Sequence, residues 1–134
     1  MDCCSPREVE RALAAGFRPE EISVTAGMLS ARDLQAFVRH GVHLNLDTRS
    51  ALRRYSQLPG HLPRVGLRIN PGVQAGWGEQ SKLQYGNSKF GFDDDAVLEA
   101  VAYAEALGLQ VDTLHTHVGW GLQESAAPLL AQVY

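Results

Sequence analysis

The stretch ISVTAGMLSARDLQAFVRHGVHLNL, residues 22–46, contains two short apolar runs that flank an amphipathic segment. Ser30 has a side chain that caps helix N-termini, and Gly41 is the residue type that most often ends a helix. The apolar runs at 22–25 and 42–46 have the length and composition of buried strands. The stretch therefore predicts a strand, a helix and a second strand, which is the repeating unit of a parallel sheet.

The same order recurs along the chain, with predicted strands that begin near residues 1, 22, 42, 64 and 111. Helices are predicted after Ser5, Ser30 and Thr48, after Asp94 or Asp95, and from residue 125 onward. We expect an α/β fold, either a partial (β/α)8 barrel of about five units or an open doubly wound sheet. Neither G-x-G-x-x-G nor G-x-x-x-x-G-K-[ST] occurs in the sequence, which disfavours the nucleotide-binding open sheet.

Composition narrows the functional classes. The net charge of −3 and the hydrophobic share of 45% are those of a soluble globular protein and argue against nucleic-acid or membrane partners. The N-terminus lacks the pattern of a signal peptide. The two cysteines, Cys3 and Cys4, are adjacent, so we expect reduced thiols that serve packing and a cytoplasmic location.

The segment 114–119, LHTHVG, places two imidazoles in a predicted strand. His115 and His117 are two residues apart and should face the same side of the sheet. Polar rings on one face of a strand need a ligand, a metal or a hydrogen-bond network. One interpretation is a metal-dependent hydrolase in which His43 and Asp47 complete a zinc site.

Four stretches in sequence order also resemble the fold-type III pyridoxal-phosphate decarboxylases, which include the ornithine, arginine and diaminopimelate enzymes. They are Asp2-Cys3-Cys4-Ser5 with Glu8, the run LRINPG at 67–72, SKFG at 88–91 and LHTHVG at 114–119. The LRINPG and H-x-H patterns favour the diaminopimelate branch. The resemblance implies an alanine-racemase-like barrel fragment, pyridoxal 5′-phosphate as cofactor, a small amino-acid substrate and a homodimer for the intact enzyme.

The resemblance also implies roles for individual residues. His117 matches the ring that stacks on the cofactor, and Gly119 matches the glycine at its phosphate. The remaining matches are cofactor-binding Arg68 and Asp2, Glu8 and Lys89 in the vicinity of the active site, and His115 as a supporting residue. Simpler interpretations stay open, because Arg68 could form a structural ion pair with Asp2 or Glu8, and Glu8 could complete a capping box with Ser5.

Two departures from the family pattern matter. Trp120 stands where the family has a phosphate-binding serine, and the Schiff-base lysine precedes the position of Asp2, where neither Lys82 nor Lys89 matches it. We therefore expect residues 1–134 to form a single incomplete barrel domain, without the C-terminal β-domain of the family. We also expect no catalytic residue in this range. The prediction is an inactive fragment of an amino-acid decarboxylase of lysine biosynthesis, with a non-catalytic interaction module of the same fold as the alternative. We also expect exposed Leu, Ile and Val on the inward face of the open barrel, and hence poor folding or self-association.

Overall fold

The computed structural model describes residues 1–72, 89–118, 124 and 127–131. Within these residues the strands are β1 (Asp2–Cys3), β2 (Ser23–Thr25), β3 (His43–Leu46), β4 (Arg64–Asn70), β5 (Phe92–Asp93) and β6 (Gln110–Thr116). The helices are α1 (Pro6–Ala14), α2 (Ala31–His40), α3 (Arg49–Ser56), α4 (Val97–Ala106) and α5 (Ala127–Leu130), with 3-10 turns η1 (Pro19–Glu21) and η2 (Asp94–Ala96). The predicted alternation of strands and helices is confirmed, and β5 is an addition to it.

Helix boundaries follow from local side-chain chemistry. The Ser30 side chain accepts the amide of Asp33 at the start of α2, while the Asp33 carboxylate accepts the amide of Ser30. Gly41 ends α2 in the left-handed conformation, at φ 66°. In α1 the predicted Ser5 cap is present, but the Glu8 carboxylate accepts the amide of Cys4 rather than that of Ser5.

The start of α4 differs from the prediction. Neither Asp94 nor Asp95 caps it, because both lie in η2, whose backbone runs directly into the helix with Ala96 at the cap position. The helix buries the small side chains of Ala100 and Ala104, whereas the larger Leu98 is 81% exposed. Small residues let α4 lie close to the strands that it covers.

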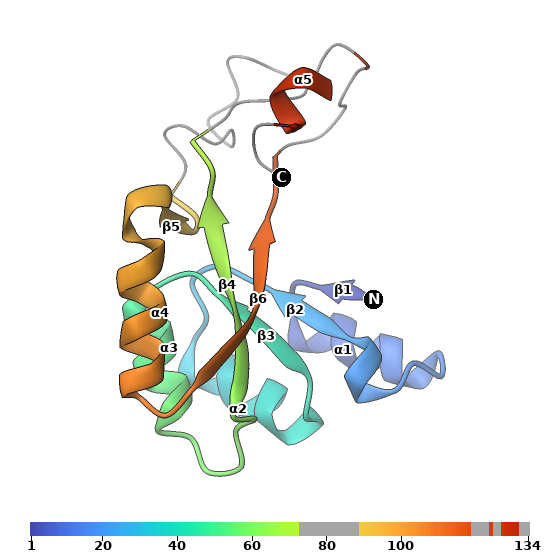
Figure 1. Ribbon diagram of the computed structural model, residues 1–134. Helices are drawn as coiled ribbons and strands as arrows, with labels where there is room; N and C mark the ends of the chain where they lie inside the picture. Colours follow the sequence, from blue (N-terminus) through green and yellow to red (C-terminus); the bar gives the residue numbers. More distant parts are fainter. Residues whose placement is uncertain (73–88, 119–123, 125–126, 132–134) are drawn as a thin grey trace.

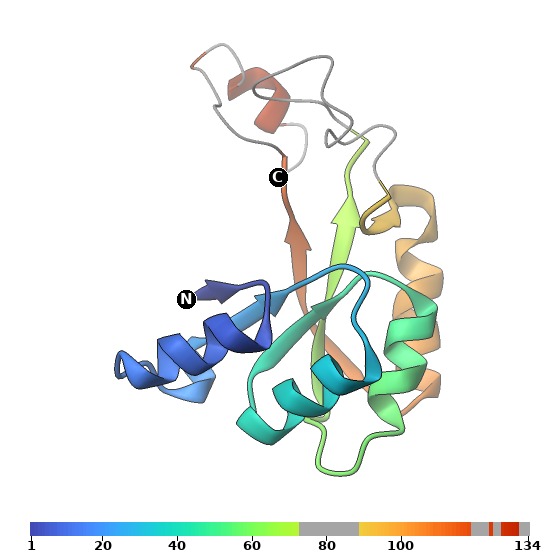
Figure 2. The ribbon, with the colours of Figure 1, turned by 180° about the vertical axis from the view of Figure 1, so that it is seen from behind.

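All strand pairs are parallel. The strands β1, β2, β3 and β4 lie side by side, β6 pairs along β4, and β5 pairs with the last residues of β4. Because β3 occupies one edge of β4, β6 lies on the other. The helices α1, α2, α3 and α4 cover one face of this curved sheet (Figures 1 and 2). The arrangement is an arc of parallel strand–helix units, as the predicted barrel fragment requires.

The two faces of the sheet have opposite character. The face beneath the helices carries buried apolar side chains, among them Cys3, Val24, Leu44, Leu46, Val65 and Leu67. The other face is lined with polar residues, so the prediction of exposed Leu, Ile and Val on that face is wrong. The physical reason is that the apolar side chains of the strands point toward the helices and are buried beneath them. Leu114 of β6 belongs to the helix-covered face, because it pairs with the buried Leu67, yet it is 59% exposed.

Candidate active site on the polar face of the sheet

Residues paired in neighbouring parallel strands share a face of the sheet, so the register defines levels on its polar face. The levels, from the N-terminal toward the C-terminal ends of the strands, are Asp2–Ser23–His43, then Thr25–Asn45–Gly66–Thr113, and then Arg68–His115. Asp2, Arg68 and His115, which the sequence interpretation assigned to the cofactor site or its vicinity, lie on one face. These three residues are far apart in the sequence, and the pairing of the strands brings them to the same face.

A hydrogen-bond network connects the first strands across this face. The Asn45 amide nitrogen donates to Ser23 Oγ and to Thr25 Oγ1, each at 2.9 Å. Thr25 Oγ1 in turn donates to Asp2 Oδ1 at 3.3 Å. The network fixes the Asp2 carboxylate at the edge of the sheet, although the residue itself is exposed. Asn45 was not among the predicted site residues.

Arg68 and His115 form the level nearest the C-terminal ends of the strands. The Arg68 guanidinium carbon lies 4.7 Å from the centroid of the Phe90 ring, and Lys89 Nζ lies 5.2 Å from the same centroid. Both cations thus lie within reach of the Phe90 ring. Phe90 was not among the predicted site residues, and its contacts with Arg68 and Lys89 make it a further residue of the candidate site.

His115 is half-buried in β6, and within the described part of the chain its Nδ1 is buried without a hydrogen-bond partner. Burial lowers the pKa of His115, and the charge of Arg68 lowers it further, while the Asp2 carboxylate opposes them. His117, directly after β6, also lowers the His115 pKa. A neutral ring with an unused nitrogen is suited to hydrogen bonding with a ligand.

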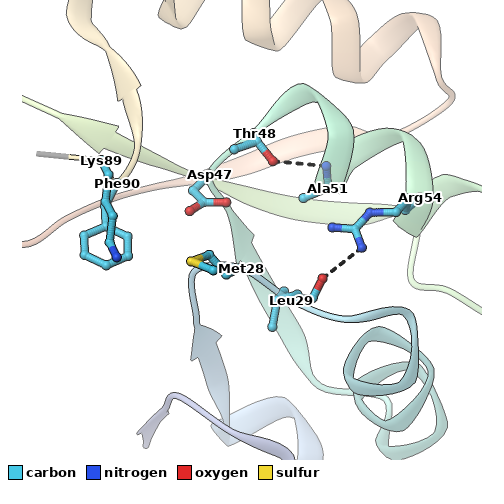
Figure 3. Close-up of a pocket in the computed structure, with 8 residues that line it drawn as sticks. All are labelled: Met28, Leu29, Asp47, Thr48, Ala51, Arg54, Lys89 and Phe90. Atoms are coloured by element: carbon cyan, nitrogen blue, oxygen red, sulfur yellow. Dashed lines mark hydrogen bonds between the residues drawn. The ribbon is translucent and has the colours of Figure 1, made fainter.

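A pocket of about 120 Å³ lies beside this level, at the ends of β2 and β3 (Figure 3). Eight residues line it: Met28, Leu29, Asp47, Thr48, Ala51, Arg54, Lys89 and Phe90. The Arg54 guanidinium donates to the Leu29 carbonyl at 2.8 Å. Burial raises the pKa of Asp47, against its own backbone hydrogen bond and the charges of Arg68 and Arg54.

The remaining predicted residues fall into three groups. Glu8 is exposed and accepts the Cys4 amide at the start of α1, which is close to its simpler interpretation as a capping residue. Cys3 is buried and Cys4 exposed, both as free thiols, so only Cys3 serves packing as predicted. Gly119 and Trp120 lie outside the described residues.

The proposed zinc site has no support in the described geometry. His43 contacts Asp112 rather than Asp47, with Nε2 and Oδ1 2.9 Å apart. Among residues 1–72, 89–118, 124 and 127–131, no group of three His, Cys, Asp or Glu side chains is placed to hold a metal ion. In the same ranges no helix is long and apolar enough to cross a membrane.

Asn45 was missed as a site residue and Asp47 was considered only as a possible zinc ligand, although the sequence carried a signal that places both on the polar face. In the run 43–47, HLNLD, polar and apolar residues alternate, and the alternation assigns His43, Asn45 and Asp47 to one face. The signal for Phe90 is absent from local sequence, because its contacts with β4 depend on the fold.

Comparison with known proteins relates this face to an enzyme family. A family model described as "Pyridoxal-dependent decarboxylase, pyridoxal binding domain" matches residues 1–132. Diaminopimelate decarboxylase of Methanothermobacter thermautotrophicus is 34% identical over 131 residues, which are 98% of this chain and 31% of that protein.

Solved structures agree. A crystal structure of a diaminopimelate decarboxylase superimposes with a TM-score of 0.78 at 30% identity, over 98% of this chain and 33% of that one. The Paramecium bursaria Chlorella virus arginine decarboxylase bound to agmatine gives a TM-score of 0.77 at 25% identity, over 98% of this chain and 34% of that one. The chain thus spans about a third of the length of the proteins it matches.

Proposed function

Because the chain belongs to the pyridoxal-dependent decarboxylase family, by its pyridoxal-binding domain, we propose that its polar face binds pyridoxal 5′-phosphate in a decarboxylase of diamino acids. Among such substrates we favour meso-diaminopimelate, since the relatives that match nearly the whole chain are diaminopimelate decarboxylases. The resemblance further implies that the intact enzyme is a homodimer.

The observation that supports the proposal best is the level formed by Arg68 and His115. It combines a cation, an imidazole nitrogen that is buried without a hydrogen-bond partner among the described residues, and a location at the C-terminal ends of parallel strands. Ligands of barrel enzymes bind at that end. The polar, anion-compatible character of this level fits a phosphorylated, hydrogen-bonding ring.

Residues of this chain would hold the cofactor by distinct contacts. His117 would lie against the pyridine ring, His115 would offer its free nitrogen, and Arg68 would supply positive charge. The resemblance assigns the phosphate contact to Gly119. When bound, the cofactor supplies an electron sink for the bond that breaks as CO₂ leaves.

We further propose that the 134-residue chain binds the cofactor without a covalent link and does not decarboxylate on its own. The support is that neither of its lysines, Lys82 and Lys89, matches the family's cofactor-linked lysine. Release of CO₂ from meso-diaminopimelate by the purified chain would contradict this part of the proposal.

Equilibrium dialysis of pyridoxal 5′-phosphate against the chain tests the binding site. Arg68→Gln should weaken binding about tenfold, because a charge-assisted contact contributes on the order of 1.5 kcal/mol. Arg64→Gln is the matched control, since Arg64 lies at the opposite end of the same strand and should leave binding unchanged. Absence of saturable binding, or equal effects of the two substitutions, would overturn the proposal.

A further inference from the structure

Asp47 is a buried carboxylate that the proposed cofactor site does not use. It directly follows β3, is 9% exposed and points into the pocket beside Met28 and Phe90 (Figure 3). Among the residues that line this pocket it is the acidic one, against the two cations Arg54 and Lys89. A buried carboxylate is costly unless nearby positive charge offsets it.

Continuation of the β3–β4 register aligns Asp47, which directly follows β3, with Arg68 of β4. Asn45 pairs with Gly66 and Leu46 pairs with Leu67, so continuation of the register by one residue aligns position 47 with position 68. Since Asp47 and Asn45 are two residues apart, both belong to the polar face. Asp47, Arg68 and His115 therefore form one level across β3, β4 and β6.

Phe90 and Asp47 converge on the same point at the end of β2. A Cβ atom added at Gly27 would lie 2.6 Å from Phe90 Cε1 and 3.5 Å from Asp47 Oδ2. The missing side chain of Gly27 thus leaves room for the ring and the carboxylate together. The Arg68 guanidinium lies over the same Phe90 ring. The positive charge of Arg68 is therefore near both the aromatic ring and the Asp47 carboxylate.

We propose that Asp47 is a positioning residue, whose buried carboxylate holds the Arg68 guanidinium at Phe90 and offsets its charge toward His115. Its role as a support for cofactor binding rests on the function proposed above. Asp47 acts through Arg68 and touches neither cofactor nor substrate. The charged and titratable groups around His115 are Arg68, Asp2 and His117. Those around Asp47 are Arg68, Arg54 and Lys89.

The test follows the titration of the His115 ring by NMR in the full 134-residue chain without cofactor. Asp47→Asn should lower the His115 midpoint by a few tenths of a pH unit, because the charge of Arg68 is then less offset. The same substitution in an Arg68→Gln background should have a much smaller effect. Asp47→Glu should restore most of the wild-type midpoint, and the exposed Asp95→Asn is the control for net charge.

An unchanged His115 midpoint in Asp47→Asn, or an equal shift with and without Arg68, would overturn the proposal. If Asp47→Asn fails to fold, the Asp47 carboxyl titration in Arg68→Gln decides the matter: loss of Arg68 should raise that midpoint, and no change would refute the contact. Dialysis of pyridoxal 5′-phosphate then separates the two proposals. A chain that binds no cofactor but shows the coupled titrations refutes the proposed function and retains the positioning role.

Discussion

His43 and Asp112 are in contact across an intervening strand. His43 Nε2 and Asp112 Oδ1 are 2.9 Å apart, although β4 lies between β3 and β6. The contact is possible because β4 has a glycine, Gly66, at the crossing point, where an added Cβ would lie 3.2 Å from His43 Cε1. A register shift in β6 next to Gly66 accompanies the crossing. One glycine thus permits side chains of non-adjacent strands to meet.

Substitution of Asp112 should change the pH dependence of stability. Burial alone would raise the pKa of Asp112, but hydrogen bonds from His43 and Thr113 and the charges of His43 and Arg64 hold it below its ordinary value. A carboxylate with a depressed pKa stabilises the fold above its unfolded pKa of about 3.9, and this contribution is lost as the pH falls through the folded value. Asp112→Asn should therefore be less stable at neutral pH and lose less stability upon acidification. Urea unfolding at several pH values measures this, with Asp95→Asn as the control. Parallel pH profiles for wild type and Asp112→Asn would contradict it.

Gly66→Ala should destabilise the sheet by about 1–3 kcal/mol through overpacking. The new Cβ would overlap Asn45 Oδ1 and lie 3.0 Å from Asn45 Cγ. Because Asn45 is the obstacle, the cost of Gly66→Ala should be smaller in an Asn45→Ala background. A double-mutant cycle by urea denaturation measures this coupling. Additive effects would mean that another neighbour resists the methyl group.

His115→Gln should flatten the stability profile in weakly acidic solution. Since the folded pKa of His115 is lowered mainly by burial, the neutral ring contributes stability above its unfolded pKa of about 6.5, and this is lost as the pH falls below that value. The difference in unfolding free energy between about pH 7.5 and about pH 5.5 should thus shrink in the variant. Leu98→Gln, which changes an exposed side chain of α4 and removes no titrating group, is the control and should retain the wild-type slope. Equal slopes for all three proteins would refute the burial of His115.

Leu114→Gln should reduce self-association of the isolated chain. Leu114 is 59% exposed on the helix-covered side of β6, a strand that pairs only with β4 among the described residues and so presents an edge that favours edge-to-edge contacts. Leu98→Gln removes a similarly exposed leucine from α4 and should leave association unchanged. Sedimentation velocity over a range of concentrations distinguishes these outcomes. A wild-type chain that is monomeric and melts cooperatively would contradict the prediction of self-association.

Sequence patterns predicted the fold well where one signal dominated. Ser30, Thr48 and Gly41 bound their helices as expected, because capping is a local interaction. The start of α4 was mispredicted, since a run of three aspartates offers several capping side chains and the backbone used none of them. The strand β5 is two residues long and owes its existence to pairing with β4, which no local pattern shows.

The candidate site was predicted in part. Motifs identified Arg68 and His115, and strand pairing brings them to one level. Asp47 and Phe90 were overlooked as parts of that level, because their significance lies in contacts between segments distant in sequence. The error about the inward face had a different cause. Leu, Ile and Val were expected on the inward face, although the alternation at 43–47 already indicated that one face of this strand is polar.

The polar face of the sheet also affects how such a chain can be synthesised. Its apolar side chains are buried between strands and helices, while Asp2, Thr25 and Asn45 are linked by hydrogen bonds on the opposite side. Water can occupy that side without hydrophobic cost. An arc of this kind can form while the chain emerges from the ribosome, and Leu114 on its last strand, β6, is then exposed beside an open sheet edge. Chaperones that shield apolar edges would then need to protect one short segment around Leu114 instead of an entire open barrel.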